Sequence, residues 1–180
     1  MTYSIGIIGC NGYVGSYLTS FFNRFDSFHV YPIEKKNYKQ MSVNEFDIII
    51  DSSNNSKKYI SESDYYLDFN ESVVNCAKNI KNFSAKKYIL ISSIDVYSSL
   101  HEICYTNEDS QLDILRQSKY GFNKFLAELL VKKTCNDWLI LRLSGMIGGS
   151  LKKGPIYDIL NDQPLRLKKT STIPVLHLEK

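Results

Sequence analysis

A tyrosine and a lysine stand four residues apart at Tyr120 and Lys124, in a segment whose apolar residues recur at helical spacing. On a helix, residues i and i+4 are neighbours on one face. A tyrosine with a pKa near 10 must lose about three pKa units to exchange protons at neutral pH, and a nearby ammonium group favours the phenolate. The pair can therefore act as an acid/base centre. Tyr31 and Lys35 have the same spacing, but their predicted strand would hold them about 13 Å apart.

A third polar group, Ser93, ends the predicted buried strand Lys87–Ser93. Open α/β sheets bind their ligands at the carboxyl ends of the strands. The Ser93 hydroxyl can hold the carbonyl or hydroxyl oxygen of a substrate while Tyr120 transfers the proton. A serine that only caps a turn is the plainer alternative.

A glycine-rich turn with the spacing GxxGxxG follows the predicted strand Tyr3–Ile8 and opens the predicted helix Tyr13–Asn23. Glycines allow a tight turn close to a pyrophosphate, and the helix N-terminus presents N–H groups and partial positive charge to that phosphate. A turn without a ligand is the alternative. The residues expected to contact a dinucleotide are Gly9, Asn11, Gly12, Tyr13, Val14 and Gly15. The Lys124 ammonium can also hold the ribose hydroxyls of a nicotinamide cofactor.

Strands and helices must alternate along the chain to position these groups. The sequence predicts strands at Tyr3–Ile8, Phe28–Ile33, Phe46–Asp51, Lys87–Ser93 and Trp138–Leu143, and helices at Tyr13–Asn23, Asp64–Asn82 and Tyr120–Lys133. Such alternation predicts an α/β fold, a parallel sheet with helices on both faces. After Gly145 the pattern weakens, and only a short helix near Ile156–Leu160 and strand-like pieces near Leu165–Leu167 and Thr172–His177 are expected.

Composition argues against several classes of protein. The apolar runs are far shorter than the roughly 20 residues of a membrane span, and the first residues lack the basic region of a secretory signal, so a cytoplasmic protein is expected. The four cysteines and three histidines are scattered, which predicts no metal site. The net charge of +3 comes from lysine pairs spread along the chain with few arginines, a pattern that does not favour nucleic-acid binding.

Four segments together resemble the extended short-chain dehydrogenase/reductase family, also called the NAD-dependent epimerase/dehydratase family. They occur in the family's order and at about its spacing, and they are Gly9–Gly15, Ser92–Ser98, Tyr120–Lys124 and Leu141–Leu143. The resemblance implies a Rossmann-type fold, bound NAD(P) and hydride transfer at a carbinol carbon of a sugar-like substrate, with nucleotide sugars among the candidates.

The resemblance also assigns roles. It implies that Tyr120 is the acid/base, Lys124 its electrostatic partner and ribose anchor, and Ser93 the oxygen-binding residue. By the same analogy a homodimer is expected to form through the helices near Asp64–Asn82 and Tyr120–Lys133.

Three segments depart from the family's pattern. After the third strand the family has a Leu-Ala-Ala-like run, whereas this chain has Asp51–Ser56. The asparagine of the family's Leu-Arg-x-x-Asn-x-x-Gly pattern is Gly145, and the Asp-Glu pair of its dehydratases is Ile94-Asp95. These departures argue against a dehydratase and leave the identity of the substrate open.

The end of the second strand bears on the choice of cofactor. An acidic residue there accepts hydrogen bonds from the adenosine ribose of NAD, whereas cations suit the 2′-phosphate of NADP. The chain has Glu34, Lys35 and Lys36 at this point, with Glu34 and Lys36 expected on one side and Lys35 on the other. NADP is the expected cofactor, with Lys35 as its contact, and NAD is the alternative. Three solvated charges without a role are the plainest reading.

Residues 1–145 are predicted to form the NAD(P)-binding Rossmann domain, and residues 146–180 the beginning of a substrate lobe that is otherwise largely missing. Two functions follow. The chain is an NAD(P)-dependent reductase, dehydrogenase or epimerase, or it is an NAD(P)-binding sensor or remnant without turnover. The intact set of Ser93, Tyr120 and Lys124 favours the enzyme, and the short lobe favours the alternative.

Overall fold

Strands and helices alternate along the chain in the computed structural model, which describes residues 2–98, 106–148, 151, 154–165, 167, 170 and 172–178. Contacts divide the chain into two compact units, Met1–Arg142 and Leu143–Lys180. The expectation that the second unit belongs to a substrate lobe stays a prediction.

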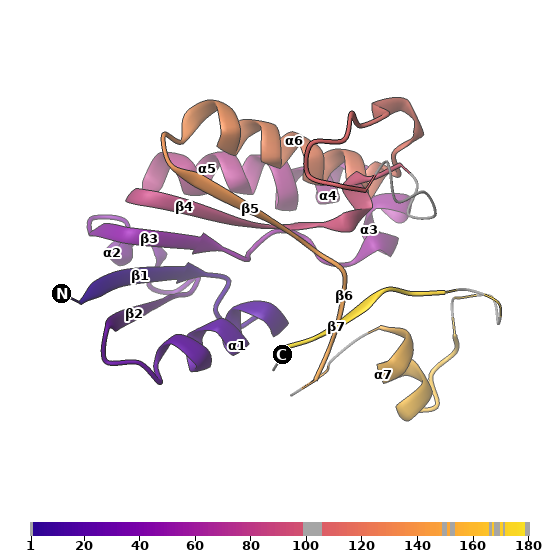
Figure 1. Ribbon diagram of the computed structural model, residues 1–180, viewed down its shortest axis with the longest axis horizontal. Helices are drawn as coiled ribbons and strands as arrows, with labels where there is room; N and C mark the ends of the chain where they lie inside the picture. The colour runs from indigo at the N-terminus through magenta and orange to yellow at the C-terminus, as the bar shows by residue number, and fades with distance from the viewer. Residues whose placement is uncertain are drawn as a thin grey trace. The chain divides into compact units, whose positions relative to one another are not determined.

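The first unit is built on a five-stranded sheet in the order β2-β1-β3-β4-β5 (Figure 1). The pairs β1–β2, β1–β3 and β3–β4 are parallel, and Ile5 in β1 lies opposite Val30 in β2 and Ile48 in β3. The predicted α/β fold is confirmed. The strands are β1 (Tyr3–Ile8), β2 (Phe28–Ile33), β3 (Glu45–Asp51), β4 (Ser84–Ser93) and β5 (Trp138–Leu143).

The helices lie close to the predicted segments, and one predicted helix is divided. The region expected to be one helix from Asp64 to Asn82 consists of α4, a π-helical turn and α5. The helical elements of the first unit are α1 (Tyr13–Phe22), α2 (Tyr38–Met41), α3 (Lys58–Ser63), α4 (Tyr65–Phe69), the π-helix η1 (Asn70–Val74), α5 (Asn75–Asn82), the 3₁₀ turns η2 (Ile94–Val96) and η4 (Ile114–Arg116), and α6 (Lys119–Thr134). Among the described helices none has the length and apolarity to cross a membrane.

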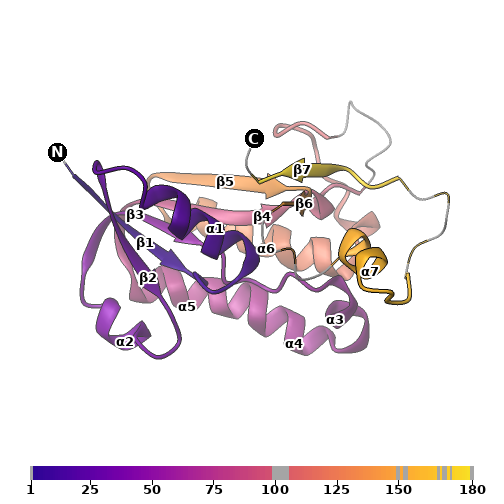
Figure 2. The ribbon, with the colours of Figure 1, turned by 90° about the horizontal axis from the view of Figure 1, so that it is seen from below.

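Helices cover both faces of the sheet, and each face has its own core (Figures 1 and 2). Strand residues point alternately to the two faces, so neighbouring isoleucines of β1 enter different cores. Under α1 the buried residues are Ile5, Ile7, Cys10 and Ile50, with Leu18 and Phe22 of α1 packed on them. The core on the face of α5 and α6 includes Ile8, Ile49, Cys76, Leu90, Ala127 and Val131.

The second unit contains a parallel strand pair, β6 (Gly145–Ile147) with β7 (Val175–His177), and the short helix α7 (Pro155–Leu160). The predicted helix near Ile156–Leu160 is confirmed, and it begins with a proline, which suits a first helical position. The predicted strand at Leu165–Leu167 is wrong, because neither leucine is in a strand and both are exposed. Strand β6 was not predicted, since its glycine pointed to a turn.

Candidate active site

The glycine turn joins β1 to α1 in a tight backbone loop. Gly9 has a φ of +80°, a conformation that favours glycine, and the Gly12 N–H donates to the Gly9 carbonyl oxygen at 2.9 Å. Gly12 is the N-cap of α1 and contributes no side-chain cap. The first N–H groups of a helix have no partner within the helix, so this end is suited to an anion.

The three glycines differ in what surrounds them. A Cβ atom on Gly15 would lie 2.2 Å from the Gly9 carbonyl oxygen and 2.6 Å from Ser52 Oγ, so α1 needs this glycine to pack against the turn. A Cβ on Gly12 would approach only the Gly9 oxygen, at 3.1 Å. Gly12 therefore leaves open space at the helix end, as a pyrophosphate requires, and the turn fits a dinucleotide.

The polar segment Asp51–Ser56 begins with a buried carboxylate. Asp51 accepts hydrogen bonds from Tyr88 Oη at 2.8 Å, from Asn79 Nδ2 at 2.9 Å and from Ser53 Oγ at 2.7 Å. These partners, on β4, on α5 and just after β3, compensate the burial of the charge. The Asn54 amide is also buried and has no hydrogen-bond partner within the described residues.

Charged residues follow the end of β2. Lys36 Nζ lies 2.9 Å from Glu34 Oε2, which places both side chains on one side, as the alternation predicted. The hydrogen bond to Glu34 raises the pKa of Lys36. The Glu34 N–H donates to Asn37 Oδ1 at 2.7 Å, which fixes the backbone at the strand end. Lys35 is exposed.

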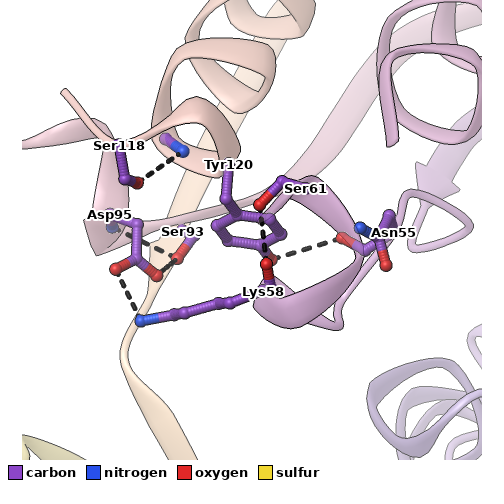
Figure 3. A network of polar contacts seen from close by, with 8 residues as sticks. Asn55, Lys58, Ser61, Ser93, Asp95, Ser118 and Tyr120 are labelled. Atoms are coloured by element: carbon purple, nitrogen blue, oxygen red, sulfur yellow. Dashed lines mark hydrogen bonds and ion pairs between the residues drawn. The ribbon is translucent and has the colours of Figure 1, made fainter. Parts of the chain in front are cut away.

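Ser93 ends β4 and is 8% exposed. Its hydroxyl donates to Asp95 Oδ2 at 2.8 Å and accepts from the Asp95 N–H at 3.2 Å (Figure 3). The other carboxylate oxygen of Asp95 lies 2.6 Å from Lys58 Nζ, so Ser93, Asp95 and Lys58 form a polar chain. Sequence reasoning did not identify Asp95 or Lys58 as site residues. Asp95 was noted only as a departure from the dehydratase pattern, and Lys58 belongs to α3, a helix that no pattern predicted.

Tyr120 and Lys124 lie in the first turns of α6 and are 6% and 4% exposed. The helix starts at an N-cap, Ser118, whose hydroxyl accepts from the Gly121 N–H at 3.0 Å. Gly121 is required there, because a Cβ would lie 1.9 Å from the Asp95 carbonyl oxygen. Lys124 Nζ lies 5.4 Å from the centre of the Tyr120 ring. The helix thus brings the tyrosine and lysine together, with Asp95 beside them.

The Tyr120 hydroxyl donates to the main-chain carbonyl oxygen of Asn55 at 3.2 Å (Figure 3). Burial raises the pKa of Tyr120 well above its usual value, and the negative charges of Asp95 and Asp68 raise it further. The expectation that Lys124 brings this pKa down toward neutrality is wrong for this structure, since burial dominates. The phenol is therefore protonated at neutral pH.

Solved structures of nucleotide-sugar enzymes share this fold. A UDP-glucuronic acid 4-epimerase from Bacillus cereus, in complex with UDP-glucuronic acid and NAD, is 18% identical, with a TM-score of 0.78 over 98% of this chain and 69% of that chain. A dTDP-4-dehydrorhamnose reductase from Bacillus anthracis, in complex with NADP, is 21% identical, with a TM-score of 0.73 over 89% of this chain and 60% of that chain. The predicted Rossmann-type fold is confirmed.

A UDP-galactose 4-epimerase is a third such structure, 19% identical with a TM-score of 0.71, and 68% of its length is covered. Neither a protein-family model nor a curated protein sequence matches the chain. The chain spans about 60 to 69% of the length of these three solved structures. At these identities the comparisons establish the fold, and the activity is inferred from the site.

Proposed function

We propose that the chain binds a nicotinamide dinucleotide at the Gly9–Gly15 turn and exchanges hydride and proton with a sugar-like carbonyl or hydroxyl. The observation that carries this proposal is the arrangement of Tyr120 and Lys124. Both are buried on one side of α6, beside the strand end that bears Ser93. A tyrosine and a lysine buried side by side serve an acid/base site better than they serve a core.

Several residues of the turn and strand ends suit the parts of the dinucleotide. The backbone at Gly9, Asn11 and Gly12 and the first turn of α1, from Tyr13 to Gly15, would hold the pyrophosphate. The Lys124 ammonium would hold ribose hydroxyls, and Lys35 would contact a 2′-phosphate. When bound, the dinucleotide supplies or accepts the hydride.

Tyr120 is the proposed proton donor. At neutral pH the hydroxyl is protonated, and Tyr120 would give the Oη proton to a carbonyl oxygen after turning it from the Asn55 carbonyl. Because a raised pKa makes the phenol a weaker acid, this transfer needs stabilisation of the phenolate, which the nearby Lys124 ammonium supplies in part. This proton transfer belongs to the direction of reduction. For the reverse direction the phenol would have to give up its proton first.

Ser93 recognises the substrate's oxygen. The Ser93 hydroxyl donates its proton to Asp95 and accepts a hydrogen bond from the Asp95 N–H. One lone pair of Oγ is then available to accept a hydrogen bond from a substrate. Ser93 in this state accepts a hydrogen bond from a hydroxyl, and it must turn away from Asp95 to donate to a carbonyl.

The similar structures support a class of substrate. Enzymes with this fold bind UDP-glucuronic acid or are named for dTDP- and UDP-sugars, which supports a nucleotide sugar. NADP and NAD are both found in these structures. We propose that residues 146–180 belong to a substrate lobe.

The test has two parts. Mass spectrometry of the protein purified without added ligand identifies a dinucleotide that accompanies it, and calorimetry gives its affinity. Oxidation of NADPH and NADH is then followed with a panel of keto-sugar nucleotides. Turnover that Tyr120→Phe removes supports the proposal. Tight dinucleotide binding without turnover on any member of the panel would instead favour a sensor or remnant.

A further inference from the structure

Three buried polar side chains, Asn55, Asp68 and Asn123, connect Tyr120 to the carbonyl that it contacts. Asn55 Nδ2 donates to Asp68 Oδ1 at 2.6 Å, and Asn123 Nδ2 donates to Asp68 Oδ2 at 2.8 Å. Asp68 and Asn123 are fully buried, and Asn55 is 5% exposed. Hydrogen bonds to a charged group in such surroundings are stronger than those at the surface.

The bonds close a circuit that begins and ends on α6. Tyr120 donates to the carbonyl of Asn55, whose side chain donates to Asp68, which in turn accepts from Asn123. Asn123 is three residues after Tyr120, so both lie on the same face of the helix. The carbonyl that receives the phenol hydroxyl is therefore fixed relative to the helix that carries the phenol.

Further bonds hold each member of the circuit. Asn55 Oδ1 accepts from the Lys57 N–H at 2.8 Å, and Asn123 Oδ1 accepts from Tyr65 Oη at 3.1 Å. Ser72 Oγ, in the π-helix η1, donates to Asp68 Oδ1 at 3.3 Å. Ser72 is four residues after Asp68, a spacing that places side chains on one face of a helix.

The circuit also brings a charge to Tyr120. The charged groups around the phenol are Asp68 from α4, Asp95 from η2 with its partner Lys58 from α3, and Lys124 from α6 itself. Asp95 has a lysine at 2.6 Å, whereas the hydrogen bonds of Asp68 described above come from neutral amides and a hydroxyl. The negative charge of Asp68 is thus held by neutral dipoles.

We propose that Asp68 and Asn123, with the Asn55 side chain, are positioning residues that fix the Tyr120 hydroxyl for proton transfer. They act through the Asn55 peptide and do not touch the substrate. The inference rests on the proposed function, in which Tyr120 is the acid. It explains why two polar residues, Asp68 and Asn123, are fully buried.

Exchanging the side chains of Asp68 and Asn123 tests this proposal. Asn123→Asp places two carboxylates against each other, so their bond survives only while they share a proton. Adding Asp68→Asn restores one amide and one carboxylate, with the donor now at position 68 and every hydrogen bond of the circuit available. Position 120 carries 3-fluorotyrosine in the full chain, and ¹⁹F NMR reports its surroundings and its titration midpoint without any substrate.

We expect Asn123→Asp to move the fluorine resonance, and the double variant to return the resonance to its original position. Asn70→Asp, which adds a carboxylate at a partly exposed site of the neighbouring π-helix, is the matched control and should leave the resonance in place. If Asn123→Asp does not fold, Asn123→Ser replaces it, and the same displacement of the resonance is expected.

An unchanged resonance in a folded Asn123→Asp or Asn123→Ser variant would overturn the proposal, as would a folded double variant that fails to restore it. A failure of the proposed function would give a different experimental result. In that case Tyr120→Phe leaves turnover intact, or no turnover is found, whatever the fluorine resonance does.

Discussion

The guanidinium of Arg142 and the carboxylate of Glu128 form a buried ion pair, with Nη2 and Oε2 2.7 Å apart and Nε and Oε1 3.0 Å apart. Glu128 is fully buried, and Ser92 Oγ donates to its Oε1 at 2.6 Å. The Arg142 guanidinium also lies 4.9 Å from the centre of the Tyr97 ring. The pair thus links β5 to α6 and, through Ser92, to the end of β4, one residue before Ser93.

Glu128→Ala should destabilise the protein by about 3 to 5 kcal/mol, because it leaves the Arg142 charge buried and unpaired. Urea unfolding followed by circular dichroism measures the loss. Lys87→Met is the matched control, since it breaks the exposed Lys87–Asp137 pair beside β5 and should cost at most about 1 kcal/mol. Equal losses for the two variants would contradict the role assigned to burial.

Gly12→Val should abolish dinucleotide binding and leave the protein folded. The φ of Gly12 is −72°, which any residue can adopt, and its Cβ position is crowded only by the Gly9 carbonyl oxygen. Calorimetry should show an affinity for NADPH at least about a hundredfold lower, about 2.7 kcal/mol. Gly15→Val is expected to fail differently, by loss of folding, because its Cβ position overlaps the turn. Unchanged affinity in folded Gly12→Val would remove the turn from the site.

Tyr120→Phe should lower the rate of reduction by at least about a hundredfold and leave dinucleotide affinity nearly unchanged, because only the proton donor is removed. Lys124→Met should reduce both. In the wild type the reduction rate should not fall as the pH rises through neutrality, since the raised pKa keeps the phenol protonated. Stopped-flow and steady-state assays across pH measure these effects. A midpoint near pH 7 that Tyr120→Phe abolishes would contradict the protonated state.

The sequence patterns predict the sheet well and the polar interior poorly. The bounds of β1, β2 and β5 agree with the prediction, because each strand is a mostly apolar run that ends at a glycine or a polar residue. The circuit of Asn55, Asp68 and Asn123 could not be predicted, since its bonds join residues 13 and 55 positions apart and periodicity reports only local structure.

The same limit explains the error in the expected pKa of Tyr120. A spacing of four residues predicts that Tyr120 and Lys124 are neighbours, and they are. It says nothing of the depth of burial or of the acids that other elements bring to the phenol, and these determine the direction of the pKa shift. Asp51 ends its strand as predicted, but its hydrogen bond to the distant Tyr88 could not be predicted from local spacing.

Asp47→Asn should remove a contribution to stability that depends on pH. The hydrogen bonds from Lys86 and from the backbone and hydroxyl of Ser4 lower the pKa of Asp47 to about 2. A group with a lowered pKa in the folded state stabilises the protein at pH values above its pKa in the unfolded chain, which is near 4. This stabilisation is lost as the pH falls toward 2. Denaturant unfolding of both proteins from pH 2 to pH 7 measures it. The difference between them should be constant above about pH 5 and should shrink toward pH 2.

The cofactor preference depends on three charges after β2. Glu34 would repel a 2′-phosphate, but its carboxylate is held by Lys36 Nζ at 2.9 Å, so its charge is largely neutralised toward a ligand. Lys35 is exposed and follows directly. The net charge of the three side chains is positive, which favours the extra phosphate of NADP.

We therefore expect NADPH to bind more tightly than NADH, with a dissociation constant about tenfold lower at moderate salt. Lys35→Ala should remove most of this preference by weakening NADPH alone, because NADH has no group at the 2′ position for a lysine to neutralise. Lys36→Ala should also weaken NADPH more than NADH, since it frees the Glu34 carboxylate as well as removing a cation. Raising the salt concentration should reduce the preference of the wild type, as screening weakens exposed charges. Calorimetric titration with both dinucleotides gives the ratio of the two dissociation constants for the wild type, Lys35→Ala, Lys36→Ala and Glu34→Gln. Tighter binding of NADH to the wild type, with Glu34→Gln removing the difference, would instead assign the strand end to the ribose hydroxyls of NAD.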